Sequence, residues 1–328
     1  MICIIYNNIL LIIPIYNNLN IQIVIYKYIT IMNKQDVTGI ILIITCKKYI
    51  YSRVVQNKYK LTGESIGSWK IIYVISEPNM NDNYKLSYVE NGLNSNLLIL
   101  KGRDDYIHLF EKVVKAQDVC LKLFNIKEGI IKCDDDILIN KSKFLEFLNN
   151  PNKGEYRGRN YKNISFPNPG PEHCKENRPD NEIRNYYTRN PKELEELKRD
   201  IPTFNHFKYN VVPKLPEGAG GCGGVYYLSN NASTAIVNYF KKCNFDVFYY
   251  EPISRSYPFI AEDTGTSFIT CYSGIVYTCD ENMFSHSWHE INKNALGFHT
   301  HLHGSAFQVK PEIYKILNGE DHERFKLF

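Results

Sequence analysis

The sequence predicts an α/β protein in which a doubly wound, mostly parallel sheet carries helices on both faces. Short continuous apolar runs, typical of strands buried on both faces, alternate along the chain with amphipathic segments of helical spacing. This alternation implies parallel strands joined by crossover helices. Ligands of such sheets bind beyond the carboxyl ends of the strands, and one of the apolar runs leads directly into three aspartates.

Three apolar runs define the first strands. Gly39–Cys46 is the first, Trp69–Ser76 is the second and Asn96–Leu100 is the third. The polar stretch Lys47–Lys60 separates the first two runs, and we expect it to form a crossover helix. This order begins a sheet of parallel strands.

A helix is expected after the third strand, and it leads to the fourth. Asp104 and Asp105 are suited to open this helix, because acidic residues favour the first helical turn. Its apolar positions recur at helical spacing, at Ile107, Phe110, Val113, Val114, Leu121 and Phe124. The fourth strand, Gly129–Cys133, then runs directly into Asp134, Asp135 and Asp136.

The second half of the chain begins with an irregular insertion at about residues 151–216. It is rich in Asn, Pro, Arg and Glu, and one capped helix is expected in it, beginning at Pro191. A glycine-rich segment, Gly218–Gly224, follows and leads into the strand Val225–Ser229. We therefore expect one large domain, residues 32–328, with the insertion lying over the sheet.

The composition excludes several classes of protein. The 328 residues carry a formal net charge of +4, and no block of like charges indicates a nucleic-acid partner or a polybasic membrane-binding segment. The nine cysteines contain no C-x-x-C pair, which disfavours a zinc ribbon, and their scattered, odd number disfavours a secreted disulfide scaffold. Function must be argued from the candidate site.

Residues 1–31 form a leader rich in Ile, Leu, Tyr and Asn. It is a mis-called start, a disordered segment or a signal anchor, and the sequence leaves all three open. Amide side chains interrupt it, whereas a membrane helix needs roughly 20 predominantly apolar residues. Translation from Met32 would give a soluble cytoplasmic protein, and an anchor would place it at a Golgi-like or ER-like membrane.

The three aspartates are the main candidate site. If the strand continues through them, Asp134 and Asp136 share one face and Asp135 points the other way. Paired carboxylates suit Mg²⁺ or Mn²⁺, which take their remaining ligands from water and substrate phosphates. A bound dication would also relieve the repulsion among three adjacent carboxylates. The alternative is a solvated acidic loop, but the position at a strand end favours the functional interpretation.

Four segments together resemble the group of β-1,3-galactosyltransferases and N-acetylglucosaminyltransferases that includes the fringe enzymes. Residues 131–140 are similar to the K-x-D-D-D-x-x-x-N segment of that group, and residues 96–102, with the helix after them, to its preceding strand and helix. Residues 220–229 resemble its G-G-G-Y-x-x-S turn and strand, and residues 261–265 its E-D-V-x-x-G motif. Each segment is weak alone, so the resemblance depends on their order and spacing over residues 38–290.

The resemblance implies a nucleotide-sugar-binding fold of the GT-A type. It also implies a Mn²⁺-dependent (or Mg²⁺-dependent) inverting transfer of a hexose or N-acetylhexosamine, from a UDP-sugar to a glycan or glycoprotein acceptor. In that scheme Asp136 is a metal ligand, Asp134 contacts the donor's ribose or the metal shell, and Asp263 is the general base. Asp135 and Glu262 are further candidates for the donor site. A single inverting displacement does require a carboxylate that takes the acceptor's proton.

The resemblance also implies a histidine downstream of the base as a third metal ligand. We favour His286, because its distance from Asp263 fits the family best. The alternatives that stay open are His289, His299, His301 and His303.

Gly223 and Gly224 are expected to lie beside the sugar. Glycine at such a turn is explained by close approach of the backbone or by a positive φ. The run is neither G-x-G-x-x-G nor a P-loop, which disfavours hydrolysis of nucleoside triphosphates.

Two other functions remain as alternatives. One is a metal-dependent phosphohydrolase or nucleotidyltransferase that uses the same aspartates. The other is a non-catalytic carbohydrate-binding protein of the same fold, although the presence of both Asp136 and Asp263 argues against it. The insertion at residues 151–216 does not resemble the family, so neither the acceptor nor the donated sugar is specified by the sequence.

Overall fold

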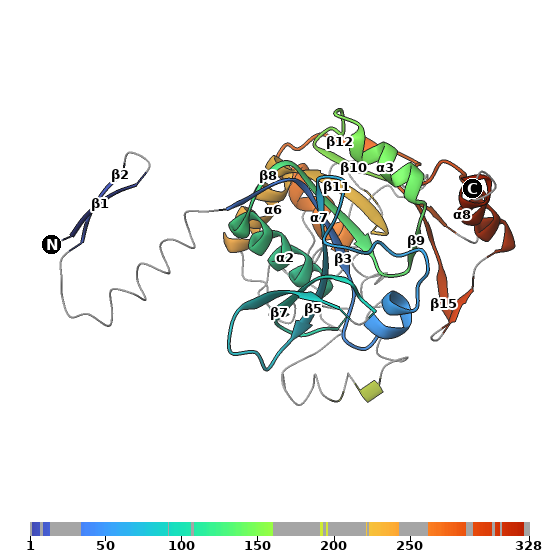
Figure 1. Ribbon diagram of the computed structural model, residues 1–328, viewed down its shortest axis with the longest axis horizontal. Helices are drawn as coiled ribbons and strands as arrows, with labels where there is room; N and C mark the ends of the chain where they lie inside the picture. Colours follow the sequence, from blue (N-terminus) through green and yellow to red (C-terminus); the bar gives the residue numbers. More distant parts are fainter. Residues whose placement is uncertain are drawn as a thin grey trace, which may run out of the picture.

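The computed structural model describes most of the chain from Lys34 onwards, and its main body is a mixed sheet with helices on both faces (Figure 1). The described residues are 2–6, 9–13, 34–90, 92–105, 108–159, 191–192, 195, 221, 223–242, 262–286, 291–303, 306–308 and 310–324. Nine strands of this part of the chain form the main sheet. The α/β class that the alternating apolar runs predict is confirmed.

The four central strands of the sheet run parallel in the order β8-β3-β5-β7. They are β3 (Gln35–Ile44), β5 (Trp69–Glu77), β7 (Ser95–Lys101) and β8 (Phe124–Asp134). All four were predicted, but β8 starts earlier than Gly129, because residues 124–127 alternate between buried and exposed side chains rather than forming a continuous apolar run. The chain winds outwards in both directions from β3, and the aspartates follow the carboxyl end of β8.

The outer strands add antiparallel pairs to the parallel centre of the sheet, which is therefore mixed as a whole. On one side β11 (Val225–Ser229) pairs antiparallel with β8, β10 (Tyr156–Gly158) antiparallel with β11, and β12 (Tyr277–Cys279) parallel with β10. On the other side β6 (Tyr84–Val89) pairs antiparallel with β7, and β4 (Ser65–Ile66) lies antiparallel to β5. The antiparallel β11 brings the glycine-rich turn back to the end of β8.

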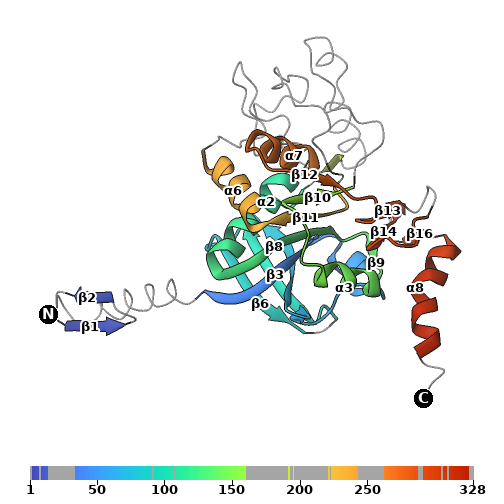
Figure 2. The same ribbon diagram turned by 90° about the horizontal axis from the view of Figure 1, so that it is seen from above.

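Helices cover both faces of the sheet (Figure 2). One face carries α2 (Leu109–Leu123), α6 (Asn230–Lys242) and α7 (Glu262–Tyr272), which also pack against one another. The other face carries α3 (Lys141–Asn149) and a short helix of π type, η1 (Ile50–Val55). Alternate β3 residues point into the two cores, with Ile40, Leu42 and Ile44 towards α2 and Ile41 and Ile43 towards the α3 side.

A second, three-stranded sheet lies next to the aspartates. It contains β9 (Ile137–Ile139), which pairs antiparallel with β14 (Gly297–His299), and β13 (Ser285–His286), which pairs parallel with β14. The hairpin β15 (His301–His303) and β16 (Ala306–Gln308) follows, and then the C-terminal helix α8 (Pro311–Arg324). This small sheet brings two of the candidate histidines to the end of β8.

Two sequence predictions differ from the observed helices. The expected crossover helix Lys47–Lys60 is limited to the six residues of η1, in a segment rich in β-branched and aromatic side chains of modest helix propensity. The helix α2 begins at Leu109 rather than at the aspartates, and Phe124 belongs to β8. Asp104 instead accepts hydrogen bonds from the backbone N–H groups of Lys47 and Ser76, and so joins the ends of the central strands.

Part of the leader and a small part of the insertion are described. Within the leader, β1 (Ile2–Tyr6) pairs antiparallel with β2 (Ile9–Ile13). Most of the insertion at 151–216 lies outside the described residues, and so does Ile107, one of the predicted apolar helix positions. Pro191, Lys192 and Glu195 are helical, as the predicted capped helix requires. Among the helices that the structure describes, none has the length and apolar character needed to cross a membrane.

Candidate functional site

Asp134 ends β8 and forms an ion pair with a buried lysine. The Nζ atom of Lys132 lies 2.7 Å from Oδ1 of Asp134 and 2.9 Å from Oε2 of Glu262, the first residue of α7. Lys132 also donates a hydrogen bond to the carbonyl oxygen of Gly223. One ammonium group therefore joins the end of β8, the glycine turn and the start of α7.

Asp135 is held on a different side of the chain from Asp134. Its Oδ2 accepts a hydrogen bond of 2.7 Å from the Thr45 hydroxyl, and its Oδ1 lies 3.3 Å from Nη1 of Arg53 in η1. The guanidinium group of Arg53 stacks 3.9 Å from the centre of the Tyr49 ring. The buried Asp135 thus ties β8 to the segment that follows β3, and Arg53 and Tyr49 lie beside the aspartates.

Asp136 lies in a turn and faces a histidine. Its backbone oxygen accepts hydrogen bonds from the N–H group of Thr300 at 3.0 Å and from the Thr300 hydroxyl at 2.9 Å. Its Oδ1 atom lies 3.3 Å from Nε2 of His299 in β14. The Nδ1 atom of His299 is in turn 3.3 Å from Nδ1 of His286 in β13. The three side chains form a row in which His299 stands between Asp136 and His286.

The strand geometry expected for Asp134 and Asp136 ends too early to put them on one face. The strand β8 stops at Asp134, and Asp135 and Asp136 form a turn, so the alternation of a strand does not extend through the three residues. The contrast between Asp134 and Asp135 holds, since they bind different partners. Asp136, however, has its own partner in the small sheet rather than sharing a face with Asp134.

The glycine turn lies between the aspartates and α7. The N–H group of Gly223 donates to Oδ2 of Asp263 over 3.2 Å, and the carbonyl oxygen of Gly224 accepts from the N–H group of Asp134 over 2.9 Å. Gly224 also packs closely on an aromatic side chain, since a Cβ atom there would lie 3.1 Å from the Phe284 ring. Neither glycine has a positive φ. Close approach is therefore the reason for glycine at position 224.

Glu262 and Asp263 form the start of α7, where the helix dipole favours acidic side chains. Glu262 is buried, is paired with Lys132, and accepts a hydrogen bond from the Tyr226 hydroxyl of β11. Asp263 is half-buried beside Gly223. The two neighbours are thus differently placed, with Glu262 inside the core and Asp263 nearer the surface.

The electrostatics of the aspartates favour a bound cation. Burial raises the pKa of Asp134, and the charges of Asp136 and Glu262 add to this effect against the opposing Lys132. Burial and the Asp136 charge likewise raise the pKa of Asp135. Burial acts in the same direction on Asp136, but the adjacent His299 imidazole outweighs it and lowers the pKa of that carboxyl. Several buried carboxylates therefore share too little positive charge.

The residues around Asp136 fit a divalent metal in the chemistry of their donors. Its Oδ1 atom is buried and receives no hydrogen bond of acceptable geometry from the described residues, although Nε2 of His299 is close to it. The Asp136 carboxylate suits Mn²⁺ or Mg²⁺, and a neutral imidazole is a common ligand of divalent metals. In the described part of the chain no three His, Cys, Asp or Glu side chains gather closely enough to hold a metal ion. A bound ion would need its further ligands from substrate and water.

The expected third ligand, His286, does not contact Asp136, because the His299 ring lies between them. His299 faces the carboxylate directly, and His286 contacts the opposite nitrogen of the His299 ring. His289 lies outside the described residues, and the side chains of His301 and His303 do as well. The arrangement favours His299, one of the alternatives, as the imidazole next to Asp136.

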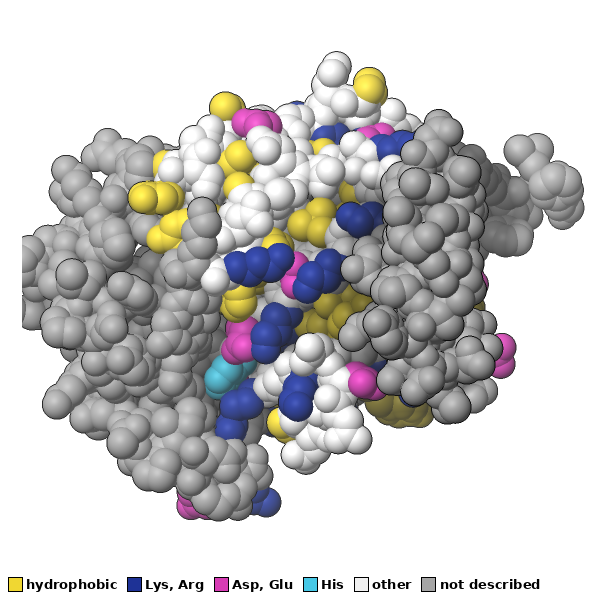
Figure 3. Space-filling model, turned by 90° about the vertical axis from the view of Figure 1, so that its left-hand side faces the viewer, with side chains coloured by type: hydrophobic (Ala, Val, Ile, Leu, Met, Phe, Trp, Pro, Cys, Tyr) yellow, Lys and Arg dark blue, Asp and Glu magenta, His cyan; other side chains and the backbone are white. Residues whose placement is uncertain are grey.

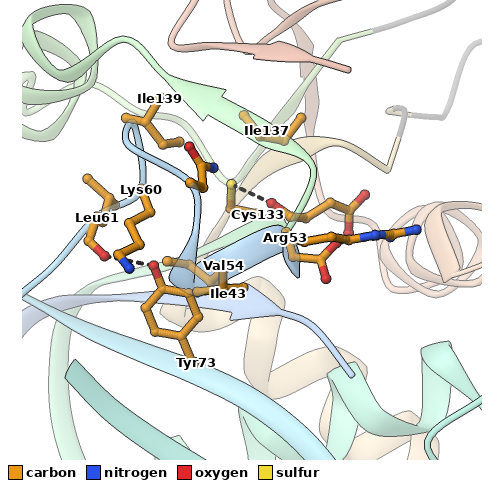
Figure 4. A pocket seen from close by; sticks show the side chains of 12 residues that line it. Ile43, Arg53, Val54, Lys60, Leu61, Tyr73, Cys133, Ile137 and Ile139 are labelled. Carbon is orange, nitrogen blue, oxygen red and sulfur yellow. Dashed lines mark hydrogen bonds and ion pairs between the residues drawn. The ribbon is translucent and has the colours of Figure 1, made fainter. Parts of the chain in front are cut away.

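A small cavity lies behind Asp135, between η1 and the ends of β3, β5 and β8 (Figure 4). Tyr73 and Lys60 line it, and the Tyr73 hydroxyl donates to the backbone oxygen of Leu61 over 2.7 Å. Its water-accessible volume of about 10 Å³ corresponds to roughly one water molecule. It is therefore too small for a nucleotide, and a donor would have to bind on the outer side of the aspartates.

On the described part of the face shown in Figure 3, the charges do not indicate a particular partner. On the face shown in Figure 3, Lys and Arg side chains gather around a few Asp and Glu side chains rather than forming a field of one sign. This agrees with the interspersed charges of the sequence. The free cysteines include Cys120 and Cys133, which are buried in the apolar core.

The sequence does not predict the charged and polar partners of the first two aspartates. These partners are Lys132 for Asp134, and Thr45 and Arg53 for Asp135. A lysine between buried apolar residues of a strand, two positions before an aspartate, is a usable signal, because a buried lysine needs a charged partner. No local signal could have paired Thr45 or Arg53 with Asp135, since that contact depends on the packing of β3 and η1 against β8.

Comparison with family models and with curated proteins identifies no relative. No protein-family model matches the chain. No curated protein matches it either. The class of protein must therefore be inferred from the site itself.

Proposed function

We propose that the protein is an inverting, metal-dependent glycosyltransferase that moves a hexose or N-acetylhexosamine from a UDP-sugar to a glycan hydroxyl. One observation carries the proposal: the adjacent residues Gly223 and Gly224 hydrogen-bond to Asp263 on one side and to the backbone of Asp134 on the other. A half-buried carboxylate and a carboxylate-rich strand end are thus held across a turn that has no side chains. This arrangement supports a proton-accepting carboxylate on one side of the turn and a diphosphate site on the other.

Asp263 is the proposed general base. It accepts a hydrogen bond from the Gly223 N–H group and stands at the start of α7, and a Cβ atom at position 223 would lie 3.6 Å from its carboxylate oxygen. An acceptor hydroxyl in hydrogen-bond reach of this carboxylate could transfer its proton there as the new glycosidic bond forms. Glu262 does not suit that role, because its two oxygens are occupied by Lys132 and Tyr226 inside the core.

Asp136 and His299 are the residues that would hold a divalent ion. When bound, such an ion would neutralise the charge that grows on the departing diphosphate. Two further residues hold Asp136 and His299 in place. Thr300 fixes the backbone of Asp136, and His286 orients the His299 ring through its second nitrogen, as outer-shell partners of ligating histidines do.

Arg53 is suited to the nucleotide side of the site. Its guanidinium group is held by Asp135 and by the Tyr49 ring, at the end of the sheet where ligands of α/β folds bind. A guanidinium group that is already held in place can pair with a phosphate without losing further side-chain freedom. The GT-A type of fold is part of this proposal, and the mixed sheet wound outwards from β3 is compatible with it.

A screen of UDP-sugars for Mn²⁺-dependent release of UDP tests the proposal. Each sugar is offered with and without a panel of glycan acceptors. A glycosyltransferase releases UDP faster with an acceptor, and the release needs the metal. UDP-sugar cleavage that no acceptor accelerates would instead support the phosphohydrolase alternative. Binding of UDP or glycan without turnover would support the non-catalytic carbohydrate-binding alternative.

A further inference from the structure

Lys132 is a buried cation, because its side chain is only 1 % exposed. Its neighbours in β8 are apolar, and an apolar side chain would fill the same volume without losing hydration. A buried ion pair is weak evidence for stability, because desolvation of the charges can exceed their attraction. The role of Lys132 must therefore be sought in what its ammonium group touches.

The ammonium group contacts three separate elements. It pairs with Asp134 at the end of β8, donates to the Gly223 oxygen in the glycine turn, and pairs with Glu262 at the start of α7. The Nζ atom also lies 5.5 Å from the centre of the Tyr226 ring in β11. The carboxylates on its two sides thus stand a fixed distance apart.

The residues that follow these contacts are those of the proposed reaction. Glu262 is directly followed by Asp263, so that fixing Glu262 also fixes the start of the helix that carries the proposed base. Gly223 donates its N–H group to Asp263 while its oxygen accepts from Lys132. The position of Asp263 relative to the donor side of the site therefore depends on Lys132 through two connections.

We infer that Lys132 is a positioning residue that fixes the start of α7, and with it Asp263, relative to the aspartates at the end of β8. The inference rests on the proposed function for its catalytic consequence but not for its structural one. Lys132 touches no reacting atom in this scheme. It affects the reaction by aligning Asp263 with the aspartates at the end of β8.

The test compares Lys132→Met with a matched control, Lys153→Met. Lys153 is also a buried lysine, 2 % exposed, and its Nζ lies 2.6 Å from Oε2 of Glu128, but it contacts no residue of the candidate site. Turnover, donor affinity and the folded fraction are measured for both. Lys132→Met should lower kcat per folded molecule roughly 100-fold, as expected for misalignment of about 1 Å. Its UDP affinity in Mn²⁺ should stay within about tenfold of wild type, since Asp136 and His299 remain.

The control separates positioning from loss of a buried charge. Lys153→Met should lose stability but keep kcat per folded molecule. If Lys132→Met does not fold, the double variant Lys132→Met/Glu262→Gln removes one positive and one negative charge together. It should fold and still turn over slowly, because the link to α7 is absent. Recovery of normal kcat in the double variant, or equal kcat in the two lysine variants, would overturn the inference.

Hydrogen exchange tests the inference even if the proposed function is wrong. Backbone amides at the glycine turn and in the first turn of α7 should exchange faster in Lys132→Met and at the wild-type rate in Lys153→Met. If wild-type protein transfers no sugar and these amides still respond, the proposed function fails and the positioning role stands. Unchanged exchange in folded Lys132→Met would show that the lysine does not hold α7.

Discussion

Gly223 and Gly224 are neighbours in one turn, but an added methyl group would meet different surroundings at each. At Gly224 the new Cβ atom would lie 3.1 Å from the ring of Phe284, which is fully buried. At Gly223 it would lie 3.6 Å from the carboxylate oxygens of Asp263 and Glu262, which is an ordinary contact distance. Because neither residue has a positive φ, alanine is compatible with both backbone conformations.

The two substitutions should therefore separate stability from turnover. Gly224→Ala crowds a packed aromatic core and should lower the free energy of unfolding by about 1–3 kcal/mol. Gly223→Ala should change that free energy by no more than about 0.5 kcal/mol, as for a substitution without steric conflict. It should nevertheless reduce kcat with an acceptor roughly tenfold or more, because its methyl group stands against the proposed base.

Chemical denaturation and acceptor-dependent UDP release, measured on both variants, test this reasoning. Donor affinity serves as the internal control and should be close to wild type for Gly223→Ala. Equal destabilisation of the two variants would refute the packing argument. Wild-type turnover by Gly223→Ala would refute the proposal that the acceptor approaches Asp263 beside Gly223.

Three further predictions concern the ionisable residues. Asp136→Asn should abolish Mn²⁺-dependent UDP binding in calorimetry. Asp134→Asn should retain measurable affinity, because Asp134 is paired with Lys132 and is not assigned to the metal; equal losses in the two variants would contradict this assignment. Replacing His299 by alanine should remove metal binding, and replacing His286 should weaken it only about 10- to 100-fold, as for an outer-shell residue; the reverse order would exchange their roles. Burial would raise the pKa of Asp105, but hydrogen bonds from His108 and Arg103 lower it to about 2. Its contribution to stability is therefore complete above the unfolded pKa of about 4 and is lost as the pH falls towards 2; Asp105→Asn should flatten acid unfolding in that range.

The parallel centre of the fold could be predicted because its strands are buried on both faces. The runs that became β3, β5 and β7 are almost continuously apolar, so their position needs no tertiary information. The direction of β11 and the pairing of the other outer strands could not be predicted, because an antiparallel partner leaves no distinct pattern in so short a strand. The helix expected over Lys47–Lys60 is limited to η1, because the segment is rich in β-branched and aromatic side chains of modest helix propensity.

The site could be predicted as a set of residues but not as a geometry. The sequence indicates the three aspartates and Asp263 as candidates, and in the structure Asp134 and Asp263 both hydrogen-bond to the glycine turn. The partner of each aspartate depends on other elements: Lys132 for Asp134, Thr45 for Asp135 and His299 for Asp136. The spacing from Asp263 favours His286, but spacing along the sequence does not reveal that β13 pairs parallel with β14. This pairing places His286 and His299 side by side.

The central claim is that Asp263 acts on the acceptor and not on the donor. The most direct measurement is kcat of Asp263→Asn at saturating acceptor, with the affinity for UDP and Mn²⁺ determined on the same preparation. Donor and metal binding should be nearly unchanged, and kcat should fall roughly 10²–10⁴-fold, the usual cost of losing a general base. A normal kcat in Asp263→Asn would show that Asp263 is not the general base.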